Sequence, residues 1–386
     1  MSKGPVTYLN QQRLPTDSYT KLDTYRQIRL PIDQASTLIP DAYTSNDFFA
    51  IEQQKIFANS WVAVGCLPQI SKTGDILVTE VAGRSIIILR TKEDKLRAFY
   101  NVCRHRGSKL LKESCNIKSI RCPYHSWSYD LEGKLKAAPH VGGTNQHKPK
   151  GFNFSDHGLK PIKIHIWHDW IFINFNGKAK KFEQYAKPLI KKFEDIDLTK
   201  LRYAATLDFG KINTNWKFLI ENFIEPYHVQ FVHKITTNQP LKDHYTVIDG
   251  ICYGSGVKVD EEDSKNSNAL SVTSRYLSLF PNFIIGTYYP NQIGVYLNVP
   301  ISPGITLQKR IIYTTDSKDM SEEEIKMVKN IWWSVHKEDH EMCERLQEGR
   351  NSPASNEGGL LSPVWEKGVQ AFQKLIVDAT MKSSKS

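Results

Sequence analysis

The sequence lacks any long hydrophobic run. Its apolar stretches, such as residues 85–89, are far too short to span a bilayer. Residues 1–19 are polar and lack the hydrophobic segment of a secretory signal. We therefore expect a protein that stays out of the membrane, with the cytoplasm as its compartment.

Cysteine is scarce as well. Six cysteines among 386 residues are too few for the disulfide scaffold of a secreted domain. Cys103 and Cys122 each lie within three residues of a histidine. This spacing favours metal binding over disulfide formation.

The excess of basic residues does not indicate a nucleic-acid site. The net charge is +10, from 51 basic and 41 acidic residues, but the lysines are scattered and no arginine-rich stripe is present. A solvated, lysine-rich surface is the favoured interpretation. Docking of an acidic electron-transfer partner is a weaker alternative.

A dinucleotide-binding fingerprint is also missing. The segment Gly254-Ser255-Gly256 lacks the third glycine of Gly-x-Gly-x-x-Gly and its flanking pattern. We therefore expect that the chain does not bind NAD(P)H itself.

The hydrophobic pattern divides the chain into three parts: a Pro-punctuated segment (1–45), a β-rich part (46–176) and a mixed part (177–386). In the β-rich part we predict a small all-β module with strands at 75–81, 85–89, 96–100 and 166–175. In the mixed part we predict an α+β domain with strands at 250–259, 277–285, 294–300 and 305–314. A long helix follows, starting near Ser321.

Two Cys–His pairs form the first metal-binding motif. Cys103-Arg104-His105 is followed after sixteen residues by Cys122-Pro123-Tyr124-His125. Two thiolates and two imidazoles suit a [2Fe–2S] cluster in which each kind of ligand binds one iron. A structural zinc site is the alternative, but zinc sites more often contain Cys-x2-Cys pairs.

Two histidines close together form the second motif. His228 and His233 are five residues apart, so a regular helix would not point both at one metal ion. Pro226 suggests a local distortion that brings them together. Two histidines and one carboxylate leave coordination positions open for dioxygen at a non-haem iron.

The predicted C-terminal helix supplies the carboxylate. Ser321 and Glu324 resemble a capping box, and the helix carries an apolar stripe formed by Ile325, Val328, Ile331, Trp332, Val335, Met342, Cys343 and Leu346. Asp339 falls within this stripe, whereas Glu338, Glu341 and Glu344 fall outside it. A carboxylate on a buried face needs a metal or a salt bridge, and we select Asp339 as the third ligand.

The cluster motif resembles that of Rieske oxygenase large (alpha) subunits. The shared pattern is Cys103-x-His105-Arg-Gly, then Cys122-Pro-x-His125 with a nearby tryptophan. The Asn-Trp-Lys…Glu-Asn-Phe segment at 215–223 and the Glu-Asp…Gly segment at 338–349 also resemble this family. Respiratory Rieske proteins have an additional cysteine in each cluster loop, and this chain does not, so Cys115 is a spare thiol.

The resemblance implies an all-β Rieske [2Fe–2S] domain and a helix-grip-like α+β catalytic domain with a central antiparallel sheet and a mononuclear Fe(II). The N-terminal segment would pack on the catalytic domain. The resemblance also implies a head-to-tail ring of subunits, usually a homotrimer. A separate flavin and iron–sulfur reductase would pass electrons from NAD(P)H to the cluster.

The resemblance gives roles to two further residues. Glu225, three positions before His228, would bridge His125 of one subunit to His228 of the next. Asn222 would lie near the open iron position, or serve only as a helix hydrogen-bonding residue. Glutamate at the bridge, where aromatic-ring oxygenases have aspartate, resembles the branch that acts on choline, carnitine and glycine betaine.

We therefore expect a monooxygenase or dioxygenase that hydroxylates or oxidatively N-demethylates a small quaternary ammonium compound. Alternatives are an aromatic acid as the substrate of the same iron machinery and, more distantly, a purely electron-carrying Rieske protein. A quaternary ammonium group favours an aromatic cage. Candidate cage residues, each of which could instead be a core residue, are Phe280, Phe283, Tyr288, Tyr289, Tyr296, Trp332 and Trp333.

Overall fold

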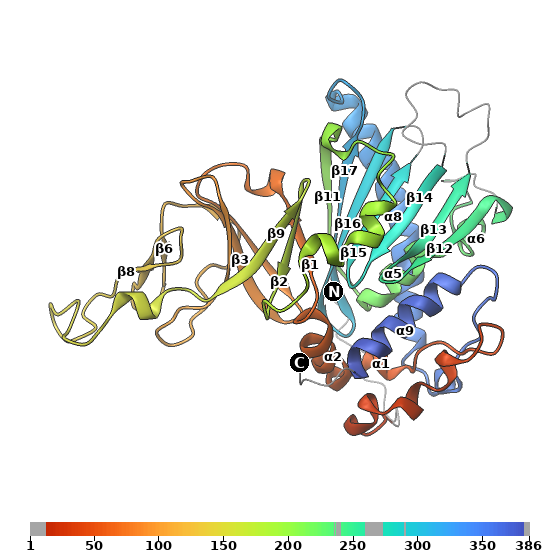
Figure 1. The fold of residues 1–386 in the computed structure, drawn as a ribbon, viewed down its shortest axis with the longest axis horizontal. Coiled ribbons are helices and arrows are strands. Elements are labelled where there is room, and N and C mark those ends of the chain that lie inside the picture. The colour runs from red at the N-terminus through yellow and green to blue at the C-terminus, as the bar shows by residue number, and fades with distance from the viewer. Residues whose placement is uncertain (1–12, 235, 237–240, 259–272, 289–290, 382–386) are drawn as a thin grey trace, which may run out of the picture. The chain divides into compact units, whose positions relative to one another are not determined.

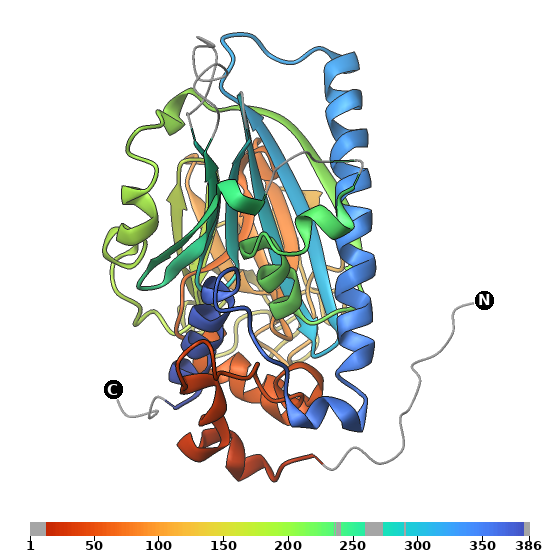
Figure 2. The ribbon, with the colours of Figure 1, turned by 90° about the vertical axis from the view of Figure 1, so that its right-hand side faces the viewer.

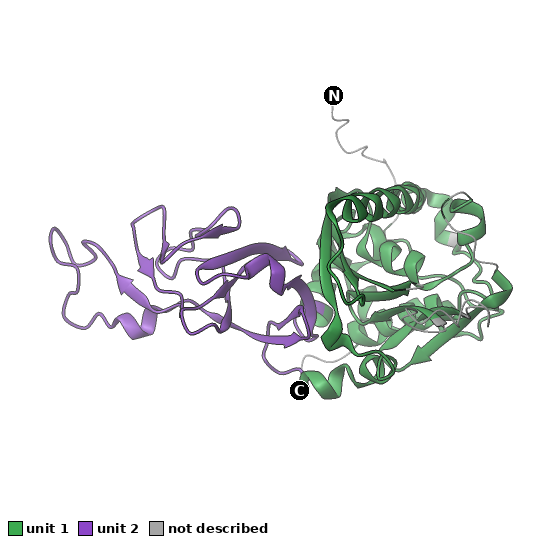
Figure 3. Cartoon of the chain, turned by 90° about the horizontal axis from the view of Figure 1, so that it is seen from above, with its two compact units in different colours: residues 1–56, 180–386 green, residues 57–179 purple. Residues whose placement is uncertain are grey.

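The structure is a computed structural model, and it describes residues 13–234, 236, 241–258, 273–288 and 291–381. The chain folds into two compact units (Figure 3). One unit comprises residues 57–179, and the other combines residues 1–56 with residues 180–386. No helix in the described part of the chain is long and apolar enough to cross a membrane.

The unit formed by residues 57–179 is built from β-strands (Figure 1). Its larger sheet has the order β1-β10-β9-β4-β3-β2-β5, with bounds β1 (Val62–Cys66), β10 (Trp170–Asn174), β9 (Pro161–Trp167), β4 (Leu96–Tyr100), β3 (Arg84–Arg90), β2 (Asp75–Val81) and β5 (Cys115–Asn116). A small sheet contains β6 (Ile120–Arg121), β7 (Ser128–Tyr129) and β8 (Leu135–Ala137). Short helical turns are η5 (Leu67–Ile70) and η6 (Phe154–His157).

The predicted strand at 166–175 is wrong, because these residues belong to two strands. β9 ends at Trp167 and β10 starts at Trp170, and the two pair in antiparallel fashion. His168 adopts a positive φ of 52° in the turn between them. The turn consists of only two polar residues, His168 and Asp169, between apolar segments, so the hydrophobic pattern did not reveal the reversal.

The other unit contains a seven-stranded antiparallel sheet (Figure 1). Its order is β11 (Arg202–Ile212), β17 (Ile305–Thr314), β16 (Gln292–Ser302), β15 (Phe283–Tyr288), β14 (Thr273–Leu279), β13 (Cys252–Lys258) and β12 (His244–Asp249). The expected α+β class and central antiparallel sheet are confirmed. The predicted strand at 277–285 is wrong, since a turn containing Pro281 separates β14 from β15.

Helices pack on this sheet (Figure 2). α8 (Glu322–Gly349) contacts β11 and α5 (Trp216–Ile224), and α9 (Lys367–Met381) contacts β12 and β13. The shorter elements are η1 (Thr16–Thr20), η2 (Leu22–Tyr25), η3 (Gln27–Arg29), α1 (Asp41–Thr44), α2 (Asn46–Glu52), η4 (Gln53–Phe57), α3 (Phe182–Tyr185), α4 (Lys187–Lys191), η7 (Leu198–Lys200), α6 (Val229–Val232), η8 (Leu241–Asp243) and η9 (Pro353–Glu357).

The long helix α8 begins where the sequence predicts. Ser321 and Glu324 form the expected capping box. The apolar stripe is only partly buried, because Ile331 and Leu346 are about half exposed. The buried side chains of this helix are Cys343 of the stripe and, outside it, His336 and Gln347.

A buried ion pair fixes α5 to the N-terminal residues. Lys217 Nζ lies 2.6 Å from Glu52 Oε1, and the two side chains are 0% and 1% exposed. Trp216 Nε1 donates a further hydrogen bond to Glu52 Oε2 over 3.2 Å. Because α5 leads directly into the histidine segment, this pair determines where that segment starts.

We predict that Lys217→Met destabilises the protein by about 3–5 kcal/mol, because the Glu52 carboxylate is left buried without its cation. Urea unfolding measures the change. Lys21→Met is the matched control, since it breaks an exposed pair with Asp17 and is expected to cost less than about 1 kcal/mol. Equal stability of Lys217→Met and the wild type would contradict the prediction.

Candidate functional site

The two Cys–His loops have the same backbone design. The Cys103 amide donates to Ser108 O, and the Cys122 amide donates to Trp127 O, each over 2.8 Å. Gly107 and Ser126, four residues after each cysteine, have positive φ values of 75° and 58°. Each chain reversal therefore holds its cysteine in the same conformation.

These loops bury the cysteine sulfur atoms and leave the histidine rings nearer the surface. Cys103 and Cys122 are buried, whereas His105 is exposed and His125 is half-buried. The centroids of the two imidazole rings lie 4.8 Å apart. Cys103 Sγ also lies 3.3 Å from the hydroxyl of Tyr129.

Two buried sulfurs and two outward imidazoles fit a [2Fe–2S] cluster. Burial opposes the Cys122 thiolate, but the amide groups of Tyr124 and His125 outweigh it and lower the pKa of Cys122. Cys115 lies on β5, between the two loops in the sequence, and packs against the buried cluster that contains Cys103 and Cys122.

The second motif lies where the helical segment that begins with α5 is interrupted. α5 ends at Ile224, Pro226 follows, and the short helix α6 occupies only residues 229–232. His228 immediately precedes α6 and His233 immediately follows it. The break removes the regular helical geometry that would have separated the two rings.

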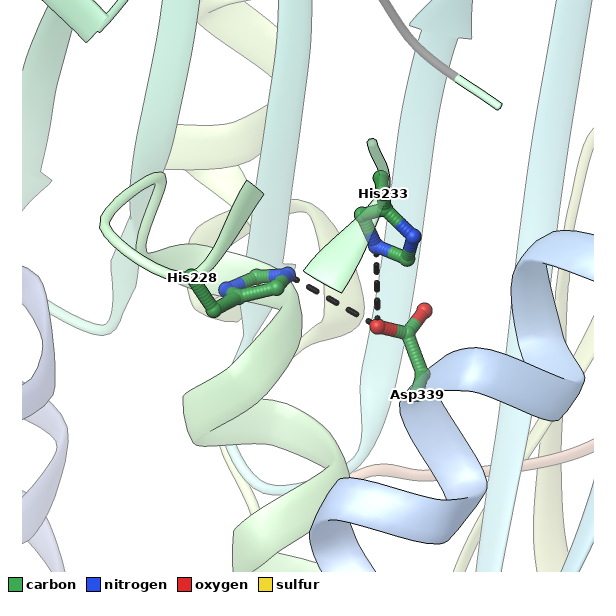
Figure 4. A group of neighbouring side chains, drawn as sticks. All are labelled: His228, His233 and Asp339. Carbon is green, nitrogen blue, oxygen red and sulfur yellow. Dashed lines mark ion pairs between the residues drawn. The ribbon is translucent and has the colours of Figure 1, made fainter. Parts of the chain in front are cut away.

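The two histidines converge on Asp339 of α8 (Figure 4). His233 Nε2 lies 3.0 Å from Asp339 Oδ1, and His228 Nε2 lies 3.6 Å from the same oxygen. The three potential ligand atoms lie within 4.8 Å of one another. Asn222 Nδ2 donates to Asp339 Oδ1 over 2.9 Å.

A carboxylate holds the Nδ1 atom of each histidine. His228 Nδ1 donates to Glu225 Oε1 over 2.6 Å, and His233 Nδ1 donates to Glu338 Oε2 over 2.7 Å. Thr236 also donates to Glu338 Oε2, over 2.8 Å. With Nδ1 protonated and held, both Nε2 atoms are available to a metal ion.

The electrostatics of the triad favour a cation. Burial lowers the pKa of His233, but hydrogen bonds and charge from Asp339 and Glu338 outweigh it and raise that pKa to about 9. Burial opposes ionisation of Asp339, yet His233 and His228 bring its pKa down to about 2. Surroundings that favour a proton on Nε2 also favour a metal ion there, and two imidazoles with one carboxylate fit non-haem Fe(II).

Glu338 is a site residue that sequence reasoning missed. The helical pattern placed it outside the apolar stripe, and its partner His233 lies 105 residues earlier. The only available signal was its position beside Asp339. His244 also lines the cavity next to the triad.

A cavity of about 330 Å³ opens beside the triad. Of the candidate cage residues, Tyr288, Tyr296 and Trp332 line it, as do Phe223 and Tyr276. Phe280, Phe283 and Trp333 are not among its lining residues, and Tyr289 lies outside the described residues. The cavity therefore combines a candidate metal site with an aromatic lining.

Family models match both units. Residues 60–148 match the Rieske [2Fe-2S] domain, and residues 193–382 match the ring hydroxylating alpha subunit (catalytic domain).

Characterised relatives align over most of the chain. It is 27% identical to chloroplastic choline monooxygenase of Atriplex hortensis, over 89% of this chain and 78% of the relative. It is also 27% identical to the carnitine monooxygenase oxygenase subunit of Escherichia coli K12, over 89% of this chain and 93% of that relative. The large oxygenase component of salicylate 5-hydroxylase from Ralstonia sp is 33% identical, over 50% of this chain and 48% of that relative.

Solved structures share the fold. A quaternary ammonium Rieske monooxygenase in complex with L-carnitine superposes with a TM-score of 0.76 and 24% identity, covering 96% of this chain and 100% of that one. Naphthalene 1,2-dioxygenase with bound indole gives a TM-score of 0.76 and 18% identity, and the match covers 95% of this chain and 96% of that one.

We predict that Glu338→Gln weakens binding of the mononuclear iron roughly 10- to 100-fold, because His233 loses the carboxylate that orients it. Iron retained after dialysis against a graded chelator measures the affinity, and the cluster absorbance should not change. Glu341→Gln on the exposed side of α8 is the control, since Glu341 pairs only with Arg345 in the described structure. Equal iron retention by Glu338→Gln and the control would show that Glu338 does not support the site.

Proposed function

Because the chain belongs to the Rieske non-haem iron oxygenases, we propose that it hydroxylates or oxidatively N-demethylates a small quaternary ammonium compound. The family establishes an enzyme with a [2Fe–2S] cluster, a mononuclear iron and a separate reductase. The observation that carries the proposal is the triad of His228, His233 and Asp339 beside an aromatic-lined cavity.

Each ligand group has a defined role in the proposal. Cys103, Cys122, His105 and His125 hold the cluster, and the triad holds the iron. When bound, the cluster supplies single electrons, and the iron supplies the open positions at which dioxygen is activated.

The surrounding residues orient the triad. Glu225 and Glu338 keep a proton on each Nδ1 and fix the plane of each ring. Asn222 donates to Asp339 Oδ1 and so restricts the direction of the carboxylate. Apolar side chains of α8, including Val328 and Val335, line the cavity and make that part of its wall apolar.

The substrate class rests on three supports. The chain aligns over 89% of its length with a choline monooxygenase and a carnitine monooxygenase oxygenase subunit. Five aromatic side chains line the cavity, and ring faces attract cations. Glu225 occupies the position of the bridging acid. An aromatic acid is the second candidate, favoured by the match to salicylate 5-hydroxylase.

The proposed assembly is a head-to-tail homotrimer in which Glu225 of one subunit bridges its own His228 to His125 of the neighbour. Exposed aromatic residues flank both ends of this bridge: Tyr227 and Phe231 near Glu225, and Tyr124 beside His125. Such apolar exposure suits a protein interface. The proposed compartment is the cytoplasm, where the unpaired state of all six cysteines is maintained.

We predict that a suitable reductase supports NAD(P)H and dioxygen consumption that depends on glycine betaine, carnitine or choline. Aldehyde release, assayed in parallel, measures coupling. Asp339→Asn should reduce turnover at least about 100-fold, because the iron loses its anionic ligand. Turnover of salicylate or benzoate, with none of any quaternary ammonium compound, would reject the proposed substrate class.

We also predict that two inactive variants complement each other. Cys122→Ser lacks the cluster and Asp339→Asn lacks the iron, so each homo-oligomer is inactive. Co-assembly of the two should restore part of the activity if electrons cross between subunits. The readout is turnover after joint refolding or co-expression, compared with a simple mixture of the assembled variants. Inactive co-assembled oligomers would contradict the inter-subunit route.

A further inference from the structure

The excess positive charge of the chain belongs to one of its two units. Residues 57–179 contain 19 basic and 9 acidic residues, which is a net charge of +10. Residues 1–56 and 180–386 together contain 32 of each kind and are neutral overall. The whole net charge therefore lies on the unit that carries the proposed cluster ligands.

Within this unit the charge is concentrated around and after the two Cys–His loops. Residues 104–150 contain ten basic and three acidic residues, and the last part, residues 134–150, contains no acidic residue at all. We define the lysine patch as the four lysines of this last part: Lys134, Lys136, Lys148 and Lys150. All four are exposed, and none forms an ion pair with a described residue.

The segment that carries the patch folds back on itself. The His140 amide donates to His147 Nδ1 over 3.0 Å, which closes the loop after β8. β8, which contains Lys136, contacts η6, and Lys148 Nζ lies 5.5 Å from the ring centroid of Phe154 in η6. Both ends of the segment therefore meet at η6, in the part of the unit where β8 and its loop project from the larger sheet (Figure 1).

A row of aromatic rings links the patch to the cluster loops. The ring centroid of Phe154 lies 5.6 Å from that of Phe152, and Phe152 lies 5.6 Å from Trp127. Trp127 in turn stacks on His105 with a centroid distance of 4.8 Å. His105 is exposed, whereas the proposed subunit bridge uses His125. The patch and the bridge therefore approach different cluster ligands.

We propose that the lysine patch docks the electron-donating partner protein and that this partner presents an acidic surface to it. Unpaired like charge destabilises a folded unit, so its concentration here is expected where a partner of opposite charge covers it. Opposite charges also steer the two proteins together and fix their orientation. The docking serves the transfer of one electron: the partner's redox centre is oxidised by one electron and the cluster is reduced by one, with no atom transferred.

A nucleic acid would also be attracted by lysines, but the surroundings of the patch disfavour it. Single-stranded nucleic acids bind where free aromatic faces can stack on the bases. Phe152 and Phe154 instead pack against the buried core of the unit. Position next to an exposed cluster ligand also suits a redox protein and has no use in binding a nucleic acid.

Titration of the holoprotein with an acidic electron carrier tests the proposal. The probe is a plant-type [2Fe–2S] ferredoxin of net negative charge, whose potential lies below that of Rieske clusters. Calorimetry gives its Kd, and stopped-flow absorbance gives the rate at which it reduces the cluster. We expect the Kd to rise at least about tenfold between about 0.02 M and about 0.3 M ionic strength, because salt screens exposed charges.

A charge-reversal variant locates the docking site. Lys148→Glu combined with Lys150→Glu should raise the low-salt Kd at least about tenfold and remove most of its salt dependence. The rate of cluster reduction by a limiting amount of ferredoxin should fall by the same factor. Unchanged cluster absorbance and an unchanged rate of reduction by dithionite would show that the variant is intact.

The matched control makes the same change of charge on the neutral unit. Lys187→Glu combined with Lys191→Glu alters two exposed lysines of α4, neither of which forms an ion pair with a described residue. The control should bind the ferredoxin as the wild type does. If it loses as much affinity as the patch variant, net charge alone governs binding and the patch is rejected.

The remaining outcomes are equally decisive. A wild-type affinity that does not depend on salt, or a patch variant that binds as well as the wild type, would overturn the proposal. If duplex DNA of about 20 base pairs binds more tightly than the ferredoxin at equal ionic strength, and the patch variant abolishes this, the patch is a nucleic-acid site. No measurement involves the substrate, so none of these results bears on the quaternary ammonium function.

Discussion

The proposed iron site depends on one constraint: both histidine Nε2 atoms must face the same carboxylate oxygen. Glu225 and Glu338 meet this constraint by holding the two Nδ1 atoms. These acids come from segments far apart in the chain, one following α5 and the other on α8. The packing of α8 against α5 and β11 therefore determines the geometry of the triad.

The two motifs place their candidate metal ligands in different surroundings. The loops around Cys103 and Cys122 bury the sulfurs and leave His105 exposed, which suits a group that exchanges electrons with a partner protein. The triad instead borders a cavity of about 330 Å³ whose lining includes five Phe, Tyr and Trp side chains, which suits the binding of a small ligand beside the metal. Each arrangement follows from local backbone geometry: matched loop reversals in one case, and a helix broken before Pro226 in the other.

Some aromatic side chains of the cavity wall also pack against a buried cation. Aromatic residues that the sequence suggested as a cage for a substrate cation surround the guanidinium of Arg310 instead. Arg310 can pack this closely against β16 because Gly294 has no side chain: a Cβ there would come within 2.5 Å of Nη2. Tyr288, Tyr296 and Trp332 therefore both line the cavity and contact the buried Arg310, which is not itself a lining residue.

The sequence by itself determined the family, the fold class and the residues that the structure gathers at the triad. Spacing was enough for the Cys–His pairs, because cluster ligands lie within a few residues of each other, and helical periodicity was enough for Asp339. Only the tertiary structure revealed Glu338 and Arg310. Their partners lie on other elements, and neither a helix period nor a strand alternation records which side chains meet across a packed interface.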